Sequence, residues 1–138
     1  MKDTELKAAR DRDLFLCYQK ALREHDFPNQ REAAEYVCKH PAPRFYISAR
    51  SCSLLLGKLA AGEDISHLHP LSLKRLKDLK RLYQECFDNV PKMPRTWICE
   101  IITEMPAPEF YVTPKYAYRI INNEIRKYNR EMSRRMTK

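Results

Sequence analysis

Glycine is nearly absent from this sequence, with only Gly57 and Gly62 among 138 residues. Glycine is the residue that most readily adopts the positive φ angles of tight hairpin turns, so its scarcity argues against a β-hairpin protein. Proline is more common, with nine residues. The combination favours helices joined by proline-containing connections.

Long apolar runs are missing as well. No stretch of about 18 apolar residues occurs, so we expect no transmembrane helix. The N-terminal segment MKDTELKAARDRD is charged and lacks the apolar core of a signal peptide. We therefore expect a cytoplasmic protein, associated with the nucleoid if it binds DNA.

The sequence also lacks the short motifs that mark common catalytic sites. It contains no phosphate-cradling glycine loop, no GxSxG and no HExxH. Glu35 and Glu100 have no second carboxylate or histidine at a defined spacing, so ion pairs on helix surfaces explain both. We expect a protein that is not an enzyme and needs no cofactor.

The five cysteines are widely spaced, and no CxxC pair occurs. The closest approach to a zinc motif is Cys38-Lys39-His40, with His67 and His69 far along the chain. Structural zinc sites need four ligands at short, regular spacings, so we expect no bound metal. Cysteines within apolar stretches are typical of buried thiols in a reducing compartment.

Positive charge is abundant and unevenly distributed, with a net charge of +8. Residues 1–65 hold 11 Lys and Arg against 10 Asp and Glu, whereas residues 66–138 hold 15 against 8. Such one-sidedness indicates a polyanionic partner, most often nucleic acid. The alternative is a soluble basic protein whose lysines are merely solvated.

One phrase occurs twice, as HPAPRFYIS at His40–Ser48 and as MPAPEFYVT at Met105–Thr113. Shifting the sequence by the same 65 positions also places DLFLCYQKAL, which starts at Asp13, on DLKRLYQECF, which starts at Asp78. The matches spread over most of each copy. We therefore predict that a whole folded unit is duplicated.

Apolar spacing and helix-start signals predict three helices in each copy. Those of the first copy are Asp13–His25, Gln30–Lys39 and Ala49–Ala61. Those of the second are a helix capped by Ser72 and ending near Phe87, then Arg95–Glu104 and Pro114–Met132. The predicted fold is all-α, with two tandem tri-helical repeats and four segments: an extension at 1–12, repeat 1 at 13–65, repeat 2 at 66–132 and a basic tail at 133–138.

Caps and prolines set the predicted helix ends. Asn29, Ser48 and Thr113 have side chains suited to the N-cap position. Pro41 and Pro106 end the helices before them, because the residue that precedes a proline avoids the helical conformation.

The aromatic pairs of the repeated phrase have two expected roles. Phe45 and Phe110 are predicted to insert between helices. Tyr46 and Tyr111 are predicted either to be exposed, where they could contact a nucleic-acid backbone or stack on bases, or to shield the core.

A connection followed by a capped helix with polar residues is the outline of a helix-turn-helix unit, whose last helix can lie in the major groove. The connection is longer than the turn of about 3–4 residues in the simplest such unit, so an extended variant is expected. Arg and Lys can donate to guanine, Asn can pair with adenine, and Tyr can reach phosphate. The predicted DNA-binding residues are Arg50 in the first copy and Lys115, Tyr116, Tyr118, Arg119, Asn122, Asn123, Arg126, Arg130, Arg134 and Arg135 in the second.

Two units of this kind resemble, in architecture, the tandem tri-helical DNA-binding repeats of the homeodomain or Myb type. The phrase PAPxFY(I/V)(S/T) is also similar to small uncharacterised bacterial proteins, of mobile-element type. The resemblance implies a non-enzymatic protein that binds double-stranded DNA, either a transcription regulator or a mobile-element accessory factor. The tryptophan ladder of Myb repeats is absent, since Trp97 is the only tryptophan.

A protein-interaction adaptor is the alternative, in which LSLKRLKDLKRLYQECF offers its leucine stripe to a protein partner or a second copy. DNA is favoured if one face of the protein carries Arg119, Asn123 and Arg126 together with Lys74, Arg75 and the tail. An exposed patch of Leu54, Leu59 and Ile65 would favour the adaptor. RNA is a weaker candidate, because neither an RNP-type aromatic strand nor a GXXG loop occurs.

Overall fold

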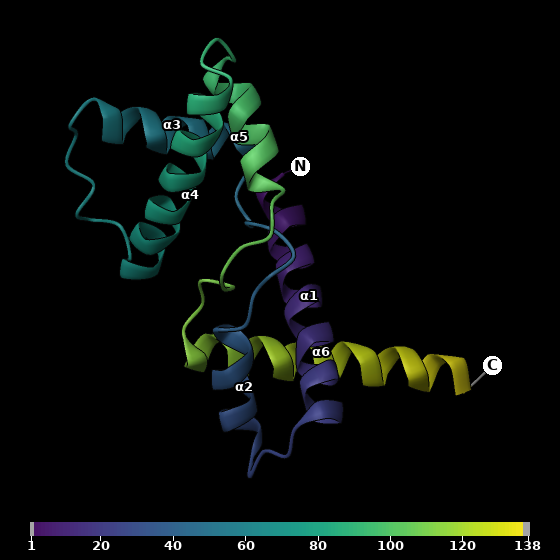
Figure 1. Ribbon diagram of the computed structural model, residues 1–138. Coiled ribbons are helices and arrows are strands. Elements are labelled where there is room, and N and C mark those ends of the chain that lie inside the picture. The colour runs from purple at the N-terminus through teal and green to yellow at the C-terminus, as the bar shows by residue number, and fades with distance from the viewer. Residues whose placement is uncertain (1, 137–138) are drawn as a thin grey trace.

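The computed structural model describes residues 2–136 as an all-helical chain (Figure 1), which confirms the predicted fold class. Its helices are α1 Asp3–Glu24, α2 Gln30–Cys38, α3 Ala49–Ala60, α4 Pro70–Asn89, α5 Arg95–Thr103 and α6 Pro114–Met136. None of the helices in this part of the chain is both long and apolar enough to cross a membrane.

Three helix starts are confirmed by their capping bonds. Asn29 Oδ1 accepts a hydrogen bond of 2.9 Å from the backbone N–H of Glu32. Ser48 Oγ accepts one of 3.1 Å at the start of α3, and Thr113 Oγ1 accepts one of 3.1 Å at the start of α6. Each bond satisfies a backbone donor that a helix start leaves without a partner inside the helix.

The start of α4 differs from the prediction. The helix begins at Pro70, not after Ser72, and the ring Nδ1 of His69 accepts a hydrogen bond of 3.1 Å from Leu71 N–H. A proline at the first helical position has a preset φ and lacks only a donor that would be unsatisfied there. His69 and Pro70 together therefore start the helix one turn earlier.

The ends of the chain are more helical than predicted. Residues 3–12, expected to be an extension, form the first part of α1, in which Leu6 and Ala9 are buried. They continue the apolar face of Leu14 and Tyr18, and this burial accounts for the longer helix. Residues 133–136 of the expected tail belong to α6, whereas Thr137 and Lys138 lie outside the described residues.

The helices do not pack in the groups expected from their order. Helix α6 packs against α1 and α2, whereas α3 packs against α4 and α5. Figure 1 shows one group at each end of the molecule, which we call the α1–α2–α6 bundle and the α3–α4–α5 bundle. The third helix of each predicted repeat therefore packs with the first two helices of the other predicted repeat, which is an exchange relative to the expected grouping.

The extended connections 39–48 and 104–113 explain the exchange. They run past each other between the bundles, and Ala42 and Ala107 form an antiparallel bridge with two N–H···O bonds of 2.9 Å. Prolines near the bridge favour extended backbone in each connection, and each connection leads its third helix to the other bundle.

Aromatic rings pair across this crossing. Phe45 stacks on Tyr111 with centroids 5.9 Å apart, and Tyr46 stacks on Phe110 at 6.0 Å. Both phenylalanines are buried, as predicted, and both tyrosines are partly buried, so they shield the core. Tyr46 donates a hydrogen bond to Asp13, and Tyr111 donates one to Asp78.

Candidate nucleic-acid interface

A groove of about 700 Å³ lies between α2 and α6 on the outside of the α1–α2–α6 bundle. We call it the α2–α6 groove. It contains six of the eleven residues predicted to bind DNA. Its lining residues are Arg31, Glu35, Pro114, Lys115, Tyr118, Arg119, Asn122, Asn123 and Arg126.

Helical periodicity places these side chains on one face of α6. Residues three or four positions apart lie above one another on a helix, as Lys115, Arg119 and Asn122 do. On the opposite face Ala117 and Ile121 are fully buried and fix the helix in the bundle. The groove wall is therefore held by core packing.

The charge of the groove is strongly positive. Lys115, Arg119 and Arg126 are exposed, and none forms a salt bridge with another described residue. The one lining carboxylate, Glu35, lies 3.7 Å from Lys39 Nζ, which partly neutralises it. The groove can therefore attract an anion without breaking an internal ion pair.

Two contacts join α2 to α6 within the groove. The guanidinium of Arg31 lies over the ring of Tyr118, with its Cζ 5.4 Å from the ring centroid. Gln30 Nε2 donates a hydrogen bond of 2.6 Å to Asn122 Oδ1. The oxygen of Asn122 is therefore engaged, which leaves Asn123 as the exposed amide.

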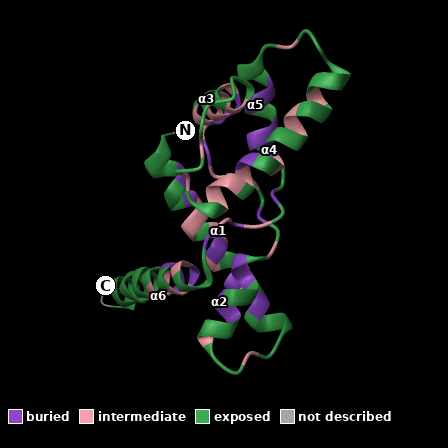
Figure 2. Ribbon diagram, turned by 90° about the vertical axis from the view of Figure 1, so that its left-hand side faces the viewer, coloured by how far each residue is buried: buried purple, intermediate pink, exposed green. Residues whose placement is uncertain are grey.

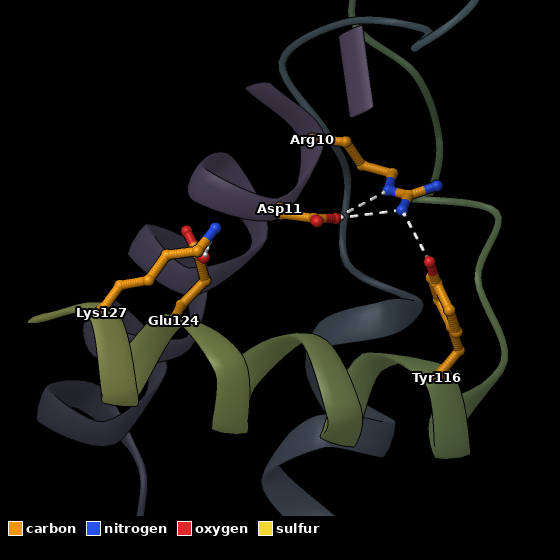
Figure 3. Close-up of polar contacts among 5 residues, drawn as sticks. All are labelled: Arg10, Asp11, Tyr116, Glu124 and Lys127. Carbon is orange, nitrogen blue, oxygen red and sulfur yellow. Dashed lines mark hydrogen bonds and ion pairs between the residues drawn. The ribbon is translucent and has the colours of Figure 1, made fainter. Parts of the chain in front are cut away.

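Tyr116 lies on another side of α6, toward α1. Figure 3 shows Arg10 of α1 between Asp11 and this tyrosine. Arg10 Nη2 is 3.4 Å from the tyrosine hydroxyl, and its Cζ is 5.3 Å from the ring centroid. The structure thus places Tyr116 outside the groove, because it is one helical step from Lys115.

Arginines continue along α6 beyond the groove. Arg130 and Arg134 follow Arg126 at intervals of four residues, so they extend the same face of the helix. Arg135 lies on a different face and pairs with Glu131 at 3.0 Å. Figure 2 shows that this last part of α6 is exposed.

Arg50 is far from the groove in the fold, since it lies on α3 in the other bundle. It stands 65 positions before Lys115, but the residues after it differ in kind. The residues 65 positions before Arg119 and Asn122 are Leu54 and Gly57. The α3 face accordingly lacks the polar side chains that α6 has at the equivalent positions.

Two surface features were expected to distinguish a DNA-binding protein from an adaptor: a shared basic face and an exposed apolar patch. The structure contains each of them only in part. Lys74 pairs with Glu109 at 2.9 Å, and neither Lys74 nor Arg75 lines the α2–α6 groove. Leu54 is 59% exposed, whereas Leu59 and Ile65 pack against the core. The charged face is therefore formed by α2 and α6 alone, and the expected apolar patch is reduced to one leucine.

Sequence reasoning missed the contribution of α2. Arg31 and Gln30 belong to the first predicted repeat, whereas their partners Tyr118 and Asn122 belong to the second. Arg31 is an exposed cation near the start of a capped helix, where a positive charge is unfavourable, and this position is the signal that the sequence offers. Its place beside α6 could not be inferred, because it depends on which helices pack together.

Comparison of the chain with protein-family models, with curated proteins and with solved structures finds no match. In the described part of the chain, no three His, Cys, Asp or Glu residues are grouped so that they could hold a metal ion.

Proposed function

We propose that the protein binds double-stranded DNA through the α2–α6 groove and the basic face of α6. The observation that carries this proposal is the gathering of Arg31, Lys115, Arg119 and Arg126 in one groove with only one carboxylate. A positive groove of this kind suits the phosphate backbone of a duplex.

The first half of α6 is the part proposed to enter the major groove, which accommodates one α-helix. Arg119 and Asn123 are exposed there and can donate to base edges. Arg126 and Arg130 lie farther along the same face, where they are proposed to contact phosphates. At 23 residues, α6 is about 34 Å long, enough to follow the duplex beyond the bases that it reads.

We also infer that the chain is an internal duplication whose two copies have exchanged their third helices. Helices α2 and α5 begin 65 positions apart, as do α3 and α6. The contacts Tyr46–Asp13 and Tyr111–Asp78 are related by the same offset. Helix α3 has Leu54 and Gly57 where α6 has Arg119 and Asn122, so only the α1–α2–α6 bundle is proposed to read DNA.

A protein adaptor is the second candidate, favoured by apolar exposure on α5. Trp97 is 61% exposed and Ile101 is 42% exposed, one helical turn apart. The leucine stripe of α4 has a different role from the one expected, because Leu76 and Leu79 are buried in the core. An adaptor surface would therefore lie on α5.

Fluorescence anisotropy of a labelled random duplex and a matched single strand, titrated with protein across a salt series, tests the proposal. We expect the duplex to bind more tightly, with an affinity that falls steeply as salt rises. Arg126→Ala should reduce the steepness of log affinity against log salt concentration by about one. Lys80→Ala, which removes an exposed cation of α4, is the control and should bind as the unaltered protein does. No binding at low salt by a folded sample would exclude DNA and favour the adaptor.

A further inference from the structure

A second cavity, of about 460 Å³, lies between the two bundles. It is lined by parts of α1, α3, α4 and α6, together with the connection before α3. The charged side chains in its lining are Asp3, Lys7, Arg10 and Arg75, so three cations face one carboxylate. We call it the arginine pocket.

Arg75 is the unusual member of this set. Its side chain is partly buried on α4, yet it forms no hydrogen bond or ion pair with any described residue. Burial lowers the pKa of Arg75, the neighbouring Tyr111 and Cys52 raise it by a smaller amount, and the positive charge of Arg10 lowers it slightly further. A guanidinium held away from water beside a second cation is costly unless an anion neutralises it.

Arg10 has spare bonding capacity on the same pocket. Its Nε and Nη2 bond to Asp11, and Nη2 also bonds to the hydroxyl of Tyr116 (Figure 3). Its Nη1 makes no bond to the residues drawn there. This nitrogen is a donor that an anion in the pocket could use.

Hydroxyl groups complete the polar lining. Ser51 and Tyr116 both line the pocket, and Ser51 Oγ already accepts a hydrogen bond of 2.9 Å from Ser48 Oγ. The Ser51 hydroxyl can therefore donate its own proton to a ligand. Arg10 and Arg75 are 65 positions apart, and so are Ser51 and Tyr116, so both pairs have the same offset as the repeated phrase.

We propose that the arginine pocket binds a phosphate group, which bridges Arg75 of the α3–α4–α5 bundle and Arg10 of the α1–α2–α6 bundle. Guanidinium groups match the oxygens of a phosphate in geometry and charge, and a tetrahedral oxyanion can accept from two of them at once. The volume is in the range of small-molecule sites and exceeds what one phosphate fills, so the group belongs to a larger molecule. That molecule is either a free phosphorylated compound or a nucleic-acid backbone.

Thermal unfolding with added pyrophosphate is the first test, with sodium chloride at equal ionic strength as the salt control. We expect the melting temperature to rise with pyrophosphate concentration and to rise more than in the chloride series, because a ligand that binds only the folded state stabilises it. An equal rise in both series, or no rise at millimolar pyrophosphate, would overturn the proposal.

Arg75→Gln and Arg81→Gln form a matched pair of variants on α4. Arg81 is exposed and lies 3.7 Å from Glu85, outside the pocket. Arg75→Gln should weaken pyrophosphate binding by at least about tenfold and should melt no lower than the unaltered protein without ligand, since it removes an uncompensated charge. Arg81→Gln should bind pyrophosphate as before. Equal losses in the two variants would overturn the pocket assignment.

Two further measurements separate the sources of the phosphate and the two proposed sites. If a short duplex competes with pyrophosphate for the unaltered protein, and Arg75→Gln weakens duplex binding, the phosphate comes from a nucleic acid. If the duplex binds without displacing pyrophosphate, the ligand is a free phosphorylated compound. Arg119→Ala, in the α2–α6 groove, should leave pyrophosphate binding unchanged. The proposed DNA site and the proposed phosphate pocket can therefore be refuted independently of each other.

Discussion

Tyr46 donates a hydrogen bond of 2.6 Å from its hydroxyl to Oδ2 of Asp13, and thereby ties the connection before α3 to α1. The tyrosine ring also stacks on Phe110 of the other connection. One side chain therefore joins a helix of one bundle to the crossing that leads to the other bundle.

Removal of this hydroxyl should destabilise the fold. Tyr46→Phe keeps the ring stacking but leaves Asp13 without its donor, and we expect a loss of about 1–2 kcal/mol in the free energy of unfolding. Urea denaturation measures it. Tyr111→Phe should cost a similar amount, because Tyr111 bonds to Asp78 in the same way. Tyr36→Phe is the control and should cost less, because Tyr36 is exposed and its hydroxyl lies 3.3 Å from His25 Nε2. A loss as large in the control would contradict the role assigned to the crossing.

Alkaline pH should weaken the fold through the same two tyrosines. Burial, followed by the hydrogen bond to an aspartate, raises the pKa of Tyr46 and of Tyr111 above the ordinary value of 10.0. The unfolded chain loses these protons near its ordinary pKa while the folded chain keeps them, so stability is complete below that value and falls as pH rises through it. Unfolding by urea from about pH 9 to about pH 11 measures the slope. The double variant Tyr46→Phe/Tyr111→Phe should lose part of that slope, and an unchanged slope would count against these pKa shifts.

The cap of α6 is open to a direct test. Thr113→Ala removes the oxygen that accepts from Tyr116 N–H, and we expect a loss of about 1 kcal/mol in the free energy of unfolding. Thr113→Ser retains the oxygen and should restore most of the stability. An unchanged melting temperature in Thr113→Ala would show that this bond does not stabilise the helix start.

Base reading and phosphate contact predict different losses for two arginines of α6. Arg119→Ala should weaken binding to a preferred duplex by about 1–3 kcal/mol and weaken binding to random duplex less. Arg134→Ala, farther along the same face, should weaken both by similar amounts. Site selection from a random library followed by anisotropy with both duplexes measures the difference. Equal ratios for the two variants would remove Arg119 from the reading face.

The local part of the fold could be predicted from the sequence. Helices α2, α3 and α6 begin where Asn29, Ser48 and Thr113 indicate, because a cap bonds to backbone within the next few residues. The start of α1 was missed because charged residues surround Leu6 and Ala9 and conceal the apolar face.

The exchange of third helices could not be predicted in the same way. Either packing would satisfy the caps, the prolines and the apolar faces of α3 and α6. The choice depends on contacts between distant residues, such as the bridge of Ala42 and Ala107. For the same reason the α6 side of the groove was predicted, whereas Arg31 of α2 was not.

The crossing of the connections has a consequence for dissection of the chain. A cut in the link between α3 and α4 would give one half with α1, α2 and α3 and another with α4, α5 and α6. The first half would lack α6, which completes the α1–α2 pair, and the second would lack α3, which completes the α4–α5 pair. Neither half would close a bundle from its own residues, although each carries one complete copy of the repeated phrase. The two fragments should fold only when mixed, and the smallest self-sufficient unit therefore spans both copies.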